Sequence, residues 1–105
     1  MKKVYHKLVR DRIPEIIEKS GKVCQTQRLT DEDYRAKLLE KLDEEVAEYR
    51  ESRNHEELAD ILEVVYALAQ ATGCSEENLN ALRAEKARAR GIFTQRILLN
   101  SVEEG

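Results

Sequence analysis

Two long segments with helical spacing, joined by a very short break, constrain this chain more than any other feature of its sequence. From 30 to 52 an apolar or aromatic residue returns every three or four positions, which is the period of one helix face. From 58 to 71 the second segment is polar at only a few positions. The residues "SRNH" leave room for a tight turn between them. We therefore expect two helices packed antiparallel, with the end of one beside the start of the other.

Capping signals predict the ends of these helices and of two more. Three residues that cap helix N-termini are each followed three positions later by a polar partner: Thr30 by Asp33, Asn54 by Glu57, and Ser75 by Asn78. Gly73 and Gly91 suit helix ends, and Pro14 and Gly21 suit the first turn and the end of a short helix. The segment "KVCQTQRL" is compatible with an extended connector or a short strand.

The composition favours an all-α fold in a single domain. Charged residues make up 37% and aromatic residues 5% of the 105 residues, with one proline, which favours helices with solvated faces over short strands. A chain of this length suits one domain over residues 1–105 with a modest core. We expect an all-α helical bundle.

The second long helix is apolar around most of its circumference. Between 58 and 71 the strongly polar residues are Asp60, Glu63 and Gln70. A helix of this kind in so small a protein needs an apolar neighbour on more than one side. We therefore expect a homodimer or homotetramer that completes the helical bundle.

The same composition disfavours several functional classes. The net charge is −3, with 18 basic and 21 acidic residues, so no stable nucleic-acid partner is expected despite the basic stretches "KLVRDR" and "RAEKARAR". No stretch approaches the roughly 18 apolar residues of a membrane span, and the N-terminus lacks the apolar run of a signal peptide. Cys24 and Cys74 suit reduced thiols better than a zinc site or a disulfide. We expect a cytoplasmic protein without a membrane partner.

Acidic residues interrupt both long helices where an apolar seam is expected. Glu45 falls on the apolar stripe of the first helix, and Glu48 shares its face. Glu57 and Asp60 continue the apolar stripe of the second helix. Across a tight antiparallel turn the four carboxylates converge, and two carboxylates about 6 Å apart repel by roughly 3 kcal/mol at an effective dielectric near 20. Such a cluster needs a cation, and an all-oxygen set suits Mg²⁺, or Mn²⁺.

A simpler interpretation is also open at this point. Acidic pairs on helices are common, and the first turn, where Glu57 and Asp60 lie, favours negative charge through the helix dipole. Lys41, four residues before Glu45, is compatible with an ordinary solvated ion pair. The register, which turns Glu57 and Asp60 toward the core face, favours the metal site.

The acidic motifs resemble those of a known superfamily. "EEVAE" at 44–48 and "ELAD" at 57–60 are similar to the EExxE and ExxD motifs of the MazG-like all-α nucleoside triphosphate pyrophosphohydrolases. The opening "YHKLVRDRIPEII" and the closing "KARARGIF" resemble the small phosphoribosyl-ATP pyrophosphohydrolase-like branch. Together these motifs span almost the whole chain, although the two acidic motifs lie closer together here than in the better-known members.

The resemblance implies Mg²⁺-dependent hydrolysis of a nucleotide between its α- and β-phosphates, giving a monophosphate and pyrophosphate. By the same resemblance the metal ligands are Glu45, Glu48, Glu57 and Asp60, and Glu44 orients or activates water. Glu44, Glu45 and Glu48 are thus the expected catalytic residues. A bound ion would leave the protein little covalent chemistry to do.

Basic residues supply the expected substrate contacts. Lys86 and Arg90 share a helix face and can bring positive charge to a polyphosphate. Lys7, Arg10 and Asp11 match the N-terminal motif of the family that the chain resembles. For Arg10 three roles are open: a pair with Asp11, a contact with phosphate, or a structural role in pinning the N-terminal segment.

Two other functions are compatible with the same sequence. A metal- and nucleotide-binding regulatory module would keep the fold and the ion without turnover, and a helical interaction scaffold would need neither. Loss of Mg²⁺ binding on substitution of Glu45 or Asp60 separates the scaffold from the other two. Turnover of triphosphates separates an enzyme from a regulatory module.

Overall fold

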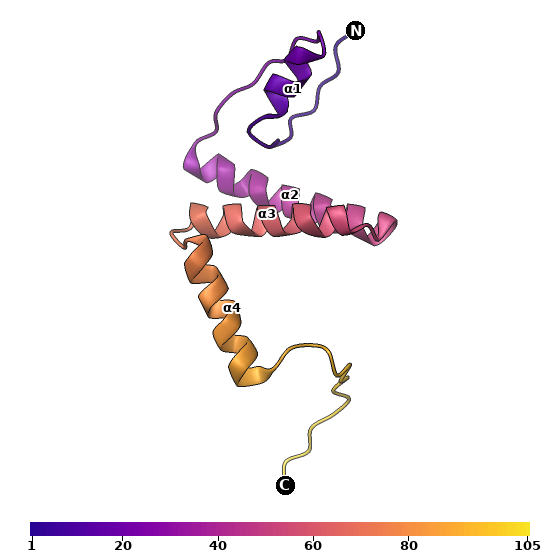
Figure 1. The fold of residues 1–105 in the computed structure, drawn as a ribbon, viewed down its shortest axis with the longest axis vertical. Helices are drawn as coiled ribbons and strands as arrows, with labels where there is room; N and C mark the ends of the chain where they lie inside the picture. Colours follow the sequence, from indigo (N-terminus) through magenta and orange to yellow (C-terminus); the bar gives the residue numbers. More distant parts are fainter.

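The chain forms four helices and no β-strand in the computed structural model, which describes all 105 residues (Figure 1). The helices are α1 (Ile13–Lys19), α2 (Asp31–Ser52), α3 (His55–Ala71) and α4 (Glu76–Arg90). The prediction of an all-α fold is confirmed. The segment between α1 and α2 is an extended connector rather than a strand.

Side-chain caps define where the three longer helices begin. The oxygen of each predicted cap accepts a backbone N–H group: Thr30 from Asp33 at 3.2 Å, Asn54 from Glu56 at 3.1 Å, and Ser75 from Asn78 at 3.1 Å. Only the partner of Asn54 differs from the prediction, by one residue. Each cap satisfies an N–H group that has no acceptor inside the helix, so each helix begins immediately after it.

A turn of two residues joins α2 to α3. Arg53 has a left-handed backbone with φ 57°, its N–H donates to the Tyr49 carbonyl oxygen at 2.8 Å, and its Nε donates to the Arg50 carbonyl oxygen at 3.0 Å. Left-handed backbone costs about 1 kcal/mol for a residue with a Cβ, and these hydrogen bonds offset part of that cost. The tight turn places the C-terminal half of α2 beside the N-terminal half of α3 (Figure 1).

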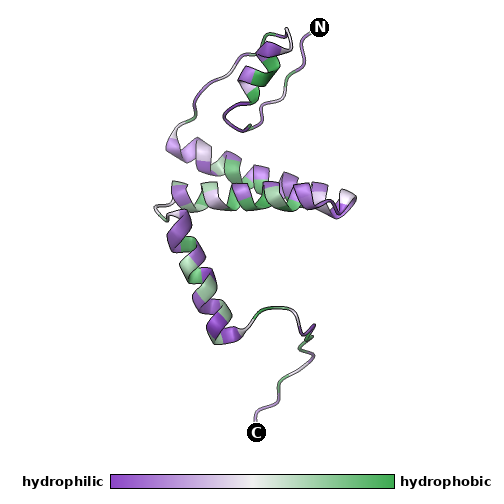
Figure 2. Ribbon diagram, viewed as in Figure 1, coloured by the Kyte–Doolittle hydropathy of each residue, from purple (hydrophilic) through white to green (hydrophobic).

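The core is a narrow seam between α2 and α3. The buried residues are Leu38 at 3% exposure, Val64 at 8% and Glu45 at 6%. Figure 2 shows α3 hydrophobic along most of its length, whereas α2 alternates between hydrophobic and hydrophilic residues. The carboxylate of Glu45 therefore occupies one of the three buried positions of the chain.

Helix α4 leaves the end of α3 and turns away from the helix pair (Figure 1). Gly73 has φ 86°, and the Cys74 N–H donates to the Ala69 carbonyl oxygen at 2.8 Å, which closes the end of α3. A left-handed residue at this position favours glycine because it has no Cβ. Helix α4 packs against α3 and not against α2.

The isolated chain is extended and exposes much apolar surface. It measures 66 × 32 × 22 Å, and its radius of gyration is 18.6 Å, against about 13 Å for a compact chain of this length. Its accessible surface is 9918 Å², against about 6,000 Å² for a compact monomer of this mass. Exposed leucines lie on all three longer helices: Leu39, Leu58, Leu62 and Leu82. None of the helices combines the length and the apolar character needed to cross a membrane.

Candidate functional site

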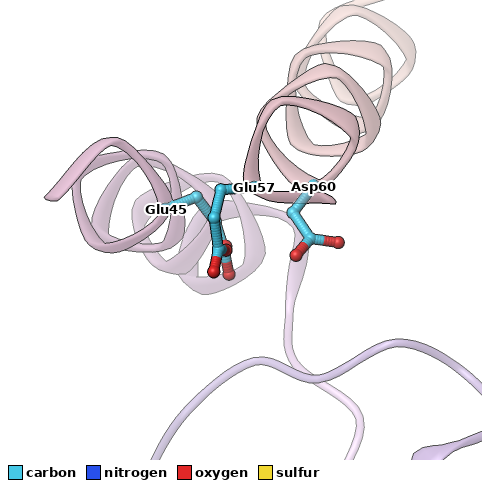
Figure 3. Close-up of side chains that lie close together, drawn as sticks. All are labelled: Glu45, Glu57 and Asp60. Atoms are coloured by element: carbon cyan, nitrogen blue, oxygen red, sulfur yellow. The ribbon is translucent and has the colours of Figure 1, made fainter. Parts of the chain in front are cut away.

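Three carboxylates from the two packed helices point into the same space (Figure 3). Glu45 comes from α2, whereas Glu57 and Asp60 come from the first two turns of α3. One oxygen of each lies within 4.8 Å of the others. Each pair at this distance repels by about 3 kcal/mol at an effective dielectric near 20. We call these three residues the acidic cluster.

Glu45 is the most buried member of the acidic cluster. Its Oε1 lies 3.5 Å from the Lys41 Nζ, but its buried Oε2 has no hydrogen-bond partner. Burial raises the pKa of Glu45, and the neighbouring charge of Glu48 raises it further. A buried carboxylate oxygen without a partner is costly, so this oxygen is the strongest indication that the protein alone does not complete the site.

Glu48 lies beside the acidic cluster on the exposed side of α2. Burial is the main cause of the raised pKa of Glu57, and the neighbouring carboxyl groups of Glu48 and Asp60 raise it further. The structure thus brings all four predicted metal ligands into one neighbourhood, three in direct proximity and Glu48 at the edge.

Two basic residues of the extended N-terminal segment reach this neighbourhood. Lys7 Nζ lies 2.9 Å from Glu44 Oε1, and Arg10 Nη2 lies 2.6 Å from Asp60 Oδ1. The hydrogen bond to Lys7 lowers the pKa of Glu44, and the same bond raises the pKa of Lys7. We call residues 7–10 the strap, because they bridge α2 and α3 across the acidic cluster.

The charges at the site do not balance. Five carboxylates meet there: the acidic cluster, Glu44 and Glu48. Three cations oppose them, Lys7, Arg10 and Lys41. The carboxylates outnumber the cations, so the site carries a net negative charge that favours a bound cation. Because all donors are carboxylate oxygens, the set suits a hard ion such as Mg²⁺ or Mn²⁺.

The spacing of the acidic cluster also fits a small cation. Oxygen ligands about 2.1 Å from one octahedral Mg²⁺ lie roughly 3 to 4 Å from each other. The oxygens of the acidic cluster, within 4.8 Å of one another, need only small side-chain movements to reach that spacing. Binding of an ion by the Glu45 carboxylate would compensate for the buried oxygen that otherwise lacks a partner.

A cavity of about 380 Å³ adjoins the acidic cluster. About half of its lining is apolar or aromatic, from Leu8, Val9, Tyr34, Leu38, Val64, Tyr66 and Ala67. The rest is polar or charged, from Arg10, Asp11, Lys41, Glu45, Asp60, Glu63, Gln70 and Glu76. Tyr66 is fixed there by its hydroxyl group, which lies 3.3 Å from Asn80 Oδ1. Ligand pockets of this size usually combine an apolar wall with a few placed polar groups.

The predicted basic residues divide into two groups in the structure. Lys7 and Arg10 contact carboxylates at the site, and Arg10 pairs with Asp60, so the predicted alternative of a pair with Asp11 is wrong. Lys86 and Arg90 lie toward the far end of α4, which points away from α2 and α3 (Figure 1). This chain does not bring them to its own acidic cluster, and their role in substrate binding stays a prediction.

Lys41 is the residue of the site that sequence reasoning undervalued. Its Nζ lies 3.5 Å from both Glu44 and Glu45, and only 24% of its side chain is exposed. The sequence indicates this contact, because Lys41 and Glu45 are four residues apart and therefore share one face of a helix. Spacing alone does not reveal which face of a helix is covered, so it is equally compatible with a solvated ion pair.

The raised pKa values of Glu45 and Glu57 predict how the stability of the metal-free protein depends on pH. A carboxyl group with a raised pKa in the folded state stabilises that state at low pH, and this contribution is lost as the pH rises through the folded pKa. The lowered pKa of Glu44 has the opposite effect: its contribution to stability is lost as the pH falls. This loss occurs only below about pH 4.5, the ordinary pKa of a glutamate.

In EDTA, thermal unfolding monitored by circular dichroism should therefore show a higher Tm near pH 4.5 than near pH 7. The difference should shrink in Glu45→Gln, which cannot ionise at this position. A Tm that rises steadily from about pH 4.5 to pH 7 in both proteins would contradict the crowded, unpaired carboxylates seen here.

Comparisons with known proteins leave the family of the chain open. A stretch of 43 residues is 58% identical to an uncharacterized protein of Mycolicibacterium smegmatis, and it covers 41% of this chain and 44% of that protein. No protein-family model and no solved structure matches the chain. The chain is thus similar to that protein over less than half the length of either.

Proposed function

We propose that this protein is a Mg²⁺-dependent nucleotide pyrophosphohydrolase of the MazG-like all-α type, which splits a nucleoside triphosphate or related nucleotide between its α- and β-phosphates. One observation carries the proposal: Glu45, which has a buried oxygen without a partner, lies against two carboxylates of the adjacent helix. A structural scaffold gains nothing from this costly arrangement. The order of the acidic and basic motifs along the chain supports the same activity.

The residues of the site have separate roles in this proposal. Glu45, Glu48, Glu57 and Asp60 would hold the cation, which supplies charge neutralisation and Lewis-acid polarisation of the phosphate oxygens when it is bound. Glu44 stays ionised because Lys7 lowers its pKa, so it can accept a hydrogen bond from water and orient it. Glu44 acts beside the cation rather than as one of its ligands.

The surroundings of the acidic cluster suit a nucleotide. The adjoining cavity of about 380 Å³ combines carboxylates with apolar side chains and two tyrosines in its lining. The carboxylates would meet the phosphates through the cation, and the apolar side chains would take the nucleoside. Arg10 also lines this cavity, and it would add positive charge toward the phosphates, while Lys7 pairs with Glu44 on the neighbouring part of α2.

The functional form in this proposal is a homodimer or homotetramer. The chain exposes on the order of 4,000 Å² more surface than a compact monomer of its mass, which exceeds the roughly 1,000 to 2,500 Å² that each partner of an obligate interface commonly buries. Leu58 and Leu62 lie one turn apart on α3 and are both exposed. A second copy packed on this face would complete the helical bundle. Contacts of Lys86 and Arg90 with substrate would then require the site of another copy.

The test is pyrophosphate release from a panel of canonical and modified nucleoside triphosphates plus phosphoribosyl-ATP, with Mg²⁺ and with EDTA. We expect Mg²⁺-dependent release with at least one substrate. Glu48→Gln should lower the rate by at least about 100-fold, because it removes a charged ligand at the open edge of the site. Glu51→Gln is the matched control, since Glu51 is exposed on the same helix one turn away.

Each result of this panel selects one function. Release that Glu48→Gln abolishes and Glu51→Gln preserves supports the enzyme. Mg²⁺ binding without release from any substrate favours a regulatory module that binds metal and nucleotide. Absence of both would favour a helical interaction scaffold and would overturn the metal site.

A further inference from the structure

The strap is held at the acidic site by side-chain charge and by Leu8 and Val9, which line the adjoining cavity, and Leu8 is half-buried. Lys7 contacts Glu44 on α2, and Arg10 contacts Asp60 on α3. Near it, the Lys37 Nζ donates to the His6 carbonyl oxygen at 3.4 Å, and no backbone hydrogen bond joins the strap to either helix. A segment held in this way responds to the charge of the surface beneath it.

Arg10 takes an oxygen of a carboxylate that the proposed cation also needs. Its Nη2 lies 2.6 Å from Asp60 Oδ1, and Asp60 is a member of the acidic cluster. A guanidinium group and a divalent cation on one carboxylate repel each other. An ion that fills the acidic cluster also removes two of the net negative charges that attract the strap.

We propose that Arg10 and the divalent cation compete for Asp60, so that the strap is docked in the metal-free protein and loosened when the ion binds. This inference rests on the metal site of the proposed function. In the metal-free state Arg10 serves as a substitute counter-ion for the acidic cluster. In the loaded state its guanidinium group is free at the mouth of the site, where it can meet a phosphate.

The first test compares the Mn²⁺ affinity of three proteins by isothermal titration calorimetry. Because coupling between two ligands of one site is reciprocal, removal of the Arg10 charge should tighten Mn²⁺ binding. We expect Arg10→Gln to lower the Kd about fivefold, within the usual range of such couplings. Arg12→Gln is the control, because Arg12 pairs with Glu15 of α1 and leaves the acidic cluster untouched.

In this comparison an unchanged or weaker affinity of Arg10→Gln would overturn the inference. A weaker affinity would mean that Arg10 orients Asp60 for the ion and stays in place when the ion binds. An equal gain in Arg12→Gln would show a general effect of net charge and would also overturn it.

The second test measures the strap directly by limited chymotrypsin digestion of the wild-type protein. Tyr5 lies just before the strap and Phe93 lies in the C-terminal tail, and both are exposed sites for this protease. Mg²⁺ should speed cleavage after Tyr5 several-fold relative to cleavage after Phe93, which serves as the internal reference. Equal or slower cleavage after Tyr5 in Mg²⁺ would mean that the strap does not loosen.

Asp60→Asn separates the failure of this inference from that of the proposed function. If the wild type binds Mn²⁺, Asp60→Asn does not, and Arg10→Gln equals the wild type, the metal site stands and only the competition is refuted. If neither the wild type nor Arg10→Gln binds Mn²⁺, the metal site is refuted and the competition with it. Tighter binding by Arg10→Gln together with loss in Asp60→Asn supports both.

Discussion

Glu45→Gln is expected to stabilise the metal-free protein while it strongly weakens binding of the divalent cation. The substitution keeps the size of the side chain but removes a buried charge whose Oε2 has no partner. It also removes the repulsion between Glu45 and its neighbours Glu48 and Asp60. We expect a gain of about 1 to 2 kcal/mol at neutral pH in EDTA, or roughly 5 to 10 °C in Tm for a chain of this size.

The same substitution should weaken Mn²⁺ binding by at least about 100-fold, because Glu45 is the most buried of the proposed ligands. Loss of a residue that only hydrogen-bonds to a metal ligand already lowers metal affinity by up to about 100-fold. Thermal unfolding in EDTA and titration calorimetry measure the two effects. Glu40→Gln is the control, since Glu40 is exposed on the same helix and its pair with Lys37 is a surface pair. A fall in stability with unchanged Mn²⁺ affinity would show that Glu45 serves only its pair with Lys41.

Leu62→Glu is expected to dissociate the proposed assembly and to lower its thermal stability. Leu62 is 50% exposed in the single chain, on a helix that is hydrophobic along most of its length (Figure 2). In an assembly packed on this face the new carboxylate would be buried without a partner, which costs several kcal/mol at each subunit. We expect a monomer by size-exclusion chromatography with light scattering, and a Tm lower by roughly 10 °C or more.

Ala47→Glu is the matched control for this prediction. It adds the same charge to an exposed position of α2, and both alanine and glutamate are strong helix formers. It should leave the size and the Tm close to those of the wild type. A wild-type protein that is already monomeric, with a Tm insensitive to Leu62→Glu, would refute the assembly and require another explanation for the exposed leucines.

The local structure of this chain was predictable because short-range interactions determine it. Caps and terminal glycines act within one helical turn, so the predicted starts after Thr30, Asn54 and Ser75 agree with the structure. The burial of Glu45 was also predictable, since its register places it on the stripe of Leu38. The convergence of the acidic cluster followed from the two-residue turn between α2 and α3.

The contacts of the strap were not predictable from spacing. Lys7 and Glu44 are 37 residues apart and Arg10 and Asp60 are 50 apart, and the connector between α1 and α2 carries no pattern that specifies where the strap returns. The N-terminal motif suggested that these basic residues matter, but it left the partner of Arg10 open. Long-range pairing of exposed charges depends on the summed field of the acidic cluster, which exists only after α2 and α3 have packed.

The sequence by itself determined the helices, their ends and the presence of carboxylates on the face that α2 and α3 bury, because periodicity and capping are properties of neighbouring residues. Only the tertiary structure decided that Glu45 Oε2 lacks a partner, that Glu48 lies at the exposed edge, and that α4 carries Lys86 and Arg90 away from the site. These features depend on how the helices pack and on which charges meet across the chain. The physical reason is that burial and Coulomb energy depend on distances in space rather than on distances along the sequence.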